Sequence, residues 1–161
     1  MMALLDRVHT RHIAMMQRTL ETLQTLIHTT PIAHLTSVTD GPDGWCALEI
    51  LCHLRDFDEI FKARVHRILQ ETAPVFTMYN HVAMVTENEY RAQDPHTVLA
   101  ALTASRHDFV ALFKGLTPEQ WERSGTHPEN GEWTVTDAAM QVAGHDLLHI
   151  EQMTRVLAQA R

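Results

Sequence analysis

TVTDAAMQVAGHDLLHIEQMTRVLAQA, residues 134–160, repeats side chains suited to a core at alternating spacings of four and three. This spacing is typical of an amphipathic α-helix, because residues three and four apart share one helix face. Thr134 and Asp137 at its start resemble a capping box, with Asp in the usual Glu position. The positions that define the face are Ala138, Val142, His145, His149, Gln152 and Val156.

Three further segments have the same periodicity, residues 3–30, 46–71 and 94–115. The last has the clearest limits, because Asp94 suits an N-cap, Pro95 suits the first helical position, and Gly115 suits a helix end. No segment alternates as a β-strand would. Four helices of about 20–27 residues predict an all-α fold, a four-helix bundle with long connecting loops.

The segments between these helices differ in length. Residues 29–44 end in the turn-rich run DGPDG, and residues 72–93 are too long for an ordinary loop, which predicts a short helix within them. A capping box that begins at Thr117 predicts another short helix before Trp121. At 161 residues in total, the chain fits one domain, residues 1–161.

Charge and hydropathy exclude several kinds of partner. The formal net charge of −7 disfavours nonspecific binding to nucleic acid or an anionic membrane, so we expect neither partner. No stretch has the ~20 apolar residues of a membrane span, and charged residues near the start leave no room for a signal peptide, which predicts a cytoplasmic protein. Cys46 and Cys52 would point about 120° apart on a helix, which forbids a disulfide between them.

Histidine is unusually frequent, with twelve in the chain. His145 and His149 lie one helical turn apart on the core-facing side of their helix, so both can reach one divalent cation. His53 occupies the apolar side of the helix predicted over residues 46–71. Three imidazoles from two helices leave positions open for water or substrate, as in catalytic metal sites. The alternative is a hydrogen-bonded polar layer in the core, with His53 a satisfied core residue.

Other polar residues are open to two interpretations. His9 and His12 have the spacing for a metal, but their arginine neighbours favour a solvated face. His81, in the link near Tyr79, is a candidate for lining a cleft. Glu49 and Asp56 flank His53 by four and three residues, so either could accept a hydrogen bond from its ring; exposed helix carboxylates are the simpler interpretation.

Two stretches together resemble the DinB-like superfamily. They are WCALEILCHL at residues 45–54 and GHDLLHIEQ at residues 144–152, with Trp133 ahead of the second. The resemblance spans about residues 43–157 and implies a four-helix bundle that binds a divalent metal through His53, His145 and His149. Imidazole ligands suit nickel and zinc, which the sequence does not separate.

The most similar branch contains bacillithiol transferases and uncharacterised relatives classed as metal-dependent hydrolases. The resemblance therefore implies a metal-dependent enzyme that transfers a low-molecular-weight thiol, of the bacillithiol or mycothiol type, to a small-molecule electrophile. The alternatives are a metal-dependent hydrolase and a noncatalytic bundle that binds a metal or small ligand. The resemblance also implies a homodimer, which the surplus apolar residues Leu4, Met16, Leu99 and Ala101 support.

Overall fold

A computed structural model describes residues 2–160 and confirms the four-helix bundle. Its long helices are α1 (Met2–Thr29), α3 (Ala47–Gln70), α5 (Pro95–Lys114) and α7 (Val135–Gln159). Each end lies within one residue of its predicted position. This agreement has a local cause, because the Asp94 carboxylate caps α5 by accepting a hydrogen bond from the Thr97 N–H.

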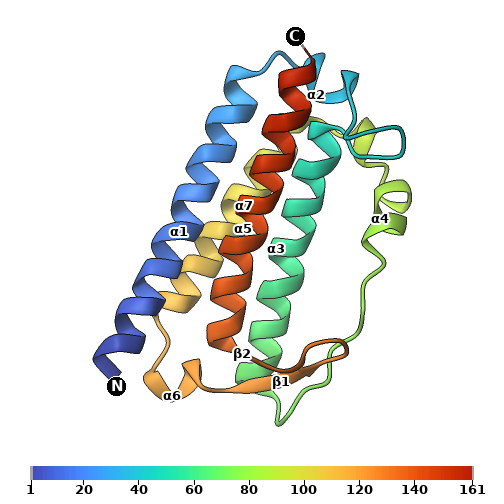
Figure 1. The fold of residues 1–161 in the computed structure, drawn as a ribbon. Helices are drawn as coiled ribbons and strands as arrows, with labels where there is room; N and C mark the ends of the chain where they lie inside the picture. Colours follow the sequence, from blue (N-terminus) through green and yellow to red (C-terminus); the bar gives the residue numbers. More distant parts are fainter. Residues whose placement is uncertain (1, 161) are drawn as a thin grey trace.

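The direction of the helices sets the length of the links. In Figure 1, α1 and α7 run in one direction and α3 and α5 in the other. Each helix packs on two neighbours, in the ring order α1, α5, α3, α7. Because α3 and α5 are parallel, the link between them must return along the bundle. It contains α4 (His81–Glu87), which confirms the predicted short helix, and the 3-10 helix η1 (Tyr90–Ala92).

Short elements close the two ends of the bundle. The first link contains α2 (His34–Ser37), and the predicted helix after Thr117 is α6 (Pro118–Trp121). Among residues 2–160, no helix combines the length and the apolarity needed to cross a membrane.

A β-hairpin follows α6, where the sequence analysis expected no strand. Strand β1 (Ser124–His127) pairs antiparallel with β2 (Gly131–Thr134), with Gly125 opposite Trp133. Four residues are too few to show a convincing alternation, so periodicity missed both strands. The loop between them is residues 128–130, and Gly131, the first residue of β2, has a positive φ of 73°, which glycine adopts without strain.

The hairpin packs closely on the link between α3 and α4, which makes Gly125 sensitive to substitution. A Cβ there would lie 2.6 Å from the Phe76 ring and 2.8 Å from the Pro74 carbonyl oxygen. We expect Gly125→Ala to lower the free energy of unfolding by about 1–3 kcal/mol through overpacking. Gly144→Ala is the control, because its Cβ would meet nothing within 4 Å, and a helical alanine should add roughly 0.5–1 kcal/mol. Urea unfolding that shows the two variants equally stable would contradict this packing.

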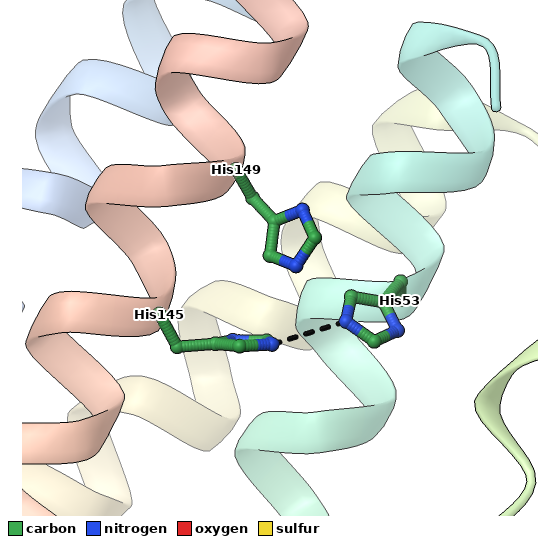
Figure 2. Close-up of side chains that lie close together, drawn as sticks. All are labelled: His53, His145 and His149. Carbon is green, nitrogen blue, oxygen red and sulfur yellow. Dashed lines mark hydrogen bonds between the residues drawn. The ribbon is translucent and has the colours of Figure 1, made fainter. Parts of the chain in front are cut away.

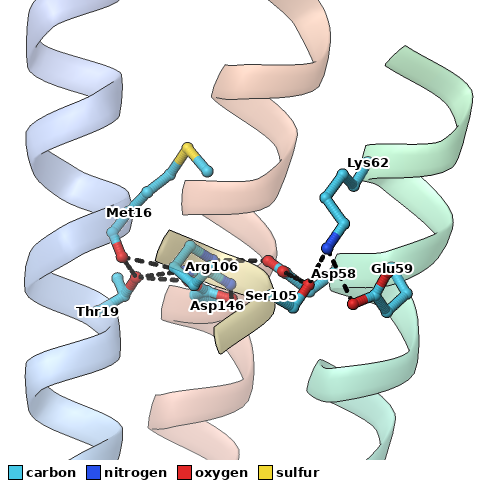
Figure 3. Close-up of polar contacts among 8 residues, drawn as sticks. All are labelled: Met16, Thr19, Asp58, Glu59, Lys62, Ser105, Arg106 and Asp146. Atoms are coloured by element: carbon cyan, nitrogen blue, oxygen red, sulfur yellow. Dashed lines mark hydrogen bonds and ion pairs between the residues drawn. The ribbon is translucent and has the colours of Figure 1, made fainter. Parts of the chain in front are cut away.

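A buried polar cluster separates the apolar core into two parts. Arg106 of α5 is 1% exposed, and its Nε donates to Asp58 of α3 at 2.6 Å. Its Nη1 and Nη2 donate to Asp146 of α7, and Nη1 also donates to the Met16 carbonyl oxygen of α1 at 3.0 Å. Figure 3 shows this cluster joining the four long helices.

The two carboxylates of the cluster have one further donor each. Thr19 donates its hydroxyl to Asp146, and Ser105 donates to Asp58. Burial opposes the charge of Arg106, but the two carboxylates outweigh it and raise the pKa of the guanidinium. A buried charge is tolerated when it is paired in this way, and each of the four long helices contributes a group to the pairing.

Candidate metal centre

The three histidines selected from the sequence meet at one point between α3 and α7. Figure 2 shows His53 of α3 opposite His145 and His149 of α7. One ring nitrogen from each lies within 4.8 Å of the other two. The His53 and His145 Nε2 atoms are 3.0 Å apart. The convergence follows from the fold, because α3 and α7 are neighbours in the bundle.

The rings have the protonation state that a metal requires. Burial lowers the pKa of His53 to about 2, and repulsion from the other histidines contributes. Burial likewise lowers the pKa of His145 to about 3 and lowers the pKa of His149. All three are therefore neutral near pH 7, and neutral imidazole is the form that binds a metal.

The spacing of one pair of nitrogens, those of His53 and His145, also fits a shared ion. With metal–nitrogen bonds of ~2.0–2.1 Å and angles between octahedral and tetrahedral, two ligand nitrogens lie roughly 2.9–3.4 Å apart. The 3.0 Å between the two Nε2 atoms falls in this range. A hydrogen bond between two neutral rings has the same length. The buried Nδ1 of His53 has no hydrogen-bond partner within residues 2–160 in either arrangement, so the number and neutrality of the converging rings carry the argument for a metal.

His149 is oriented by a chain of polar side chains. Its Nδ1 contacts the Gln152 Oε1 at 2.8 Å, which leaves Nε2 for the centre. The Gln152 amide donates to Asp40 at 3.0 Å, and Arg155 pairs with the same carboxylate at 2.9 Å. Fixing one ring nitrogen in this way sets the tautomer and aims the other. Gln152 was not predicted to orient His149, although its position three residues further along the same helix places the two side chains side by side.

The two carboxylates considered as partners of His53 lie elsewhere. Glu49 accepts from the Cys46 backbone N–H at 2.8 Å and so caps α3, and it is 8% exposed. Asp56 accepts from the Tyr90 hydroxyl. Neither forms a hydrogen bond with His53, so the first interpretation is wrong for both. Exposure is wrong as well, because capping holds Glu49 inside and the Asp56 side chain, paired with Arg55, is 16% exposed.

A cavity of about 280 Å³ opens beside the three histidines. Trp45, Phe57 and His81 form its other walls. The Trp45 and Phe57 rings lie 4.8 Å and 4.4 Å from the His53 ring, between centroids. The interpretation of His81 as a cleft-lining residue is confirmed, with its ring 6.1 Å from that of His53. A small molecule in this cavity would touch the histidines and pack against the aromatic rings.

The prediction of a solvated face for His9 and His12 is wrong for His9 and holds only in part for His12, which is partly buried. His9 is 6% exposed, its ring stacks on Trp121 at 3.9 Å, and its Nε2 lies 2.9 Å from the Thr136 hydroxyl. The cause is Trp121 of α6, which covers this face of α1. The arginine residues next to His9 in the sequence give no indication of this contact. Burial lowers the pKa of His9, so the ring is a neutral core residue.

Comparison with known proteins agrees with this architecture. The sequence profile of the DinB superfamily matches residues 11–153. This chain belongs to the DinB superfamily. Among its relatives, YfiT of Bacillus subtilis (strain 168) is 27% identical over 124 residues, which are 74% of this chain and 68% of YfiT. The resemblance inferred from residues 45–54 and 144–152 is thereby confirmed.

Solved structures show that other proteins share this fold. The YfiT structure, described as a probable metal-dependent hydrolase with an unusual four-helix bundle topology, superposes with a TM-score of 0.86 at 22% identity. The match covers 94% of this chain and 86% of YfiT. The mycothiol-dependent maleylpyruvate isomerase matches with a TM-score of 0.73 at 7% identity, over 90% of this chain but 60% of the isomerase. These likenesses concern the fold.

Proposed function

We propose that this chain is a metal-dependent enzyme that acts on a small molecule, with His53, His145 and His149 as the metal ligands. The observation that carries the proposal is the convergence of three neutral imidazoles from two helices beside a cavity. Their number favours a catalytic site over a closed structural one, because three protein ligands leave positions free. Nickel and zinc both suit these ligands.

The residues of the chain have separate tasks in this proposal. A divalent metal, when bound, lowers the pKa of a thiol or water molecule and so supplies a nucleophile at neutral pH. His53, His145 and His149 hold the charge without neutralising it, since imidazole is an uncharged ligand. Trp45 and Phe57 give the cavity apolar walls, which lower the local dielectric and strengthen the electrostatic effect of that charge on a substrate.

Two reaction types fit this site. We propose transfer of a low-molecular-weight thiol of the bacillithiol or mycothiol type to an electrophile, and the fold shared with a mycothiol-dependent isomerase supports it. Hydrolysis is the second candidate, because YfiT, described as a probable metal-dependent hydrolase, has the higher sequence identity to this chain.

The experiment is an activity assay of the full chain loaded with nickel or zinc. Bacillithiol, mycothiol and cysteine are each offered with monochlorobimane as electrophile, and p-nitrophenyl acetate reports hydrolysis. Thiol transfer that chelation abolishes supports the first reaction, and chelator-sensitive ester cleavage alone supports the second. Bound metal without turnover of any of these compounds would favour the noncatalytic binding protein.

A homodimer stays a prediction, as does the cytoplasmic location. Two of the apolar residues that suggested a dimer are core residues, because Met16 is 0% exposed and Leu99 is 3% exposed. Leu4 remains exposed, and so do Leu147 and Leu148 on α7. We expect sedimentation equilibrium at micromolar concentrations to give twice the monomer mass; a monomer at high micromolar concentration would contradict it.

A further inference from the structure

A second cavity, of about 230 Å³, adjoins the first. Phe57, His81 and His145 line both cavities, so a molecule in the second reaches the histidine cluster. The additional lining comes from the end of α3, the link that follows it, the hairpin and α7. These lining residues include Phe61, Arg64, Met78, Tyr79, His127 and Gln141.

Arg64 is a buried cation in this wall without a protein anion. It is 7% exposed, and its Nη2 donates to the Thr77 carbonyl oxygen at 3.0 Å. Its Nε is buried without a hydrogen-bond partner, and within residues 2–160 no carboxylate lies within 4.0 Å of the guanidinium. Glu129 also lines the cavity, but it is exposed and forms no such pair.

Arg64 differs from the other buried arginine, Arg106, in having no carboxylate partner within residues 2–160. Both arginines are more than nine-tenths buried, yet Arg106 has two carboxylates and Arg64 has none. The partners of Arg64 are the faces of Phe76, Tyr79 and Trp133, whose centroids lie 5.4–6.0 Å from its Cζ. Aromatic faces attract a cation, but they compensate its lost hydration less than an anion does.

We propose that Arg64 binds the carboxylate of a small-molecule ligand in the second cavity and so directs the rest of that ligand toward His145. The inference rests on the proposed function, because it names the class of substrate that the histidine site would take. A guanidinium suits a carboxylate, and aromatic walls suit an apolar body. His127, 7% exposed, adds no competing anion, and burial lowers its pKa, so its ring is neutral.

The test measures binding of benzoate to the full chain by isothermal titration calorimetry, both as purified and after chelation. Benzamide is the neutral analogue of nearly the same shape. We expect saturable binding of benzoate, with benzamide roughly 10- to 100-fold weaker, as a charge-assisted hydrogen bond predicts. Arg64→Met should weaken benzoate binding by a similar factor, and Arg64→Lys should weaken it less.

Arg67→Met is the matched control, because Arg67 lies one turn further along α3 and also contacts the following link. Its guanidinium lies 5.7 Å from the Phe76 centroid and donates to the Val75 carbonyl oxygen, but it pairs with Glu71. This variant should bind benzoate within about twofold of the original chain, if Arg64 rather than link anchoring is responsible.

Three results would overturn the proposal. They are no saturable benzoate binding to the original chain, equal binding of benzoate and benzamide, and equal loss in Arg64→Met and Arg67→Met. Because chelated protein is included, the outcome does not depend on the metal. Metal content of Arg64→Met, measured in parallel, should be unchanged, so failure of the carboxylate site and failure of the metal site are told apart.

Discussion

Replacing Arg106 with methionine should lower the free energy of unfolding by about 3–5 kcal/mol. Methionine keeps much of the apolar stem but removes the cation, so Asp58 and Asp146 remain buried, close to each other and uncompensated. Burial already raises the pKa of Asp58 although Arg106 acts to lower it, so the loss of Arg106 leaves the burial of this carboxylate uncompensated. Urea unfolding followed by circular dichroism measures the loss.

The cause can be separated from a general effect of losing an arginine. Arg67→Met removes an exposed pair with Glu71 and should cost about 1 kcal/mol or less. Converting Asp58 and Asp146 to asparagine in the Arg106→Met background should recover part of the stability, because the buried negative charges disappear. If Arg106→Met and Arg67→Met lowered the free energy of unfolding equally, the buried cluster would contribute no more stability than an exposed ion pair.

Replacing any one of His53, His145 and His149 with alanine should abolish the stabilisation that metal gives. A ligand present at 100 to 1,000 times its Kd adds about 2.7–4.1 kcal/mol to the folded state, which appears as a rise in melting temperature. With one of three ligands removed, the same metal concentration no longer saturates the site, so the stabilisation is lost. Thermal melts with nickel or zinc, and with chelator, measure the difference.

Two further variants complete this series. His107→Ala changes an exposed histidine of α5 and should keep the full metal-dependent shift. Gln152→Ala removes the partner that orients His149 and should weaken metal binding by roughly 10- to 100-fold without abolishing it. A metal-dependent shift that survives intact in the single histidine variants would exclude them as ligands.

Local sequence signals were enough to predict the four long helices, and the predicted ends of these helices agree closely with the structure. Capping residues and periodicity are local, which is why the ends of α5 at Asp94 and Gly115 could be read directly. The same periodicity placed His53, His145 and His149 on core faces. Periodicity could not predict how α3 and α7 are aligned along the bundle axis, because this depends on packing between helices. The family resemblance was needed to predict that the three histidines meet.

Buried charged residues are harder to predict from the sequence than apolar core residues. Arg106, Asp58 and Asp146 are polar residue types, which usually face water. Yet Leu99, Leu102, Arg106, Phe109 and Phe113 follow one another at spacings of three and four, so the position of Arg106 on the core face was visible. Arg64 carried the same signal, because Phe57, Phe61, Arg64 and Ile68 also follow one another at spacings of four and three. What the sequence could not show is which residues surround Arg64, because they come from the link and the hairpin, whose places depend on the fold.

Elemental analysis of the purified chain by inductively coupled plasma mass spectrometry tests the central claim most directly. The original chain and His107→Ala, each exposed to nickel or zinc and then desalted, should retain about one divalent ion per chain. The triple variant His53→Ala, His145→Ala, His149→Ala should retain almost none while its far-ultraviolet spectrum stays helical. Full metal content in the triple variant, or none in the original chain, would contradict the metal centre.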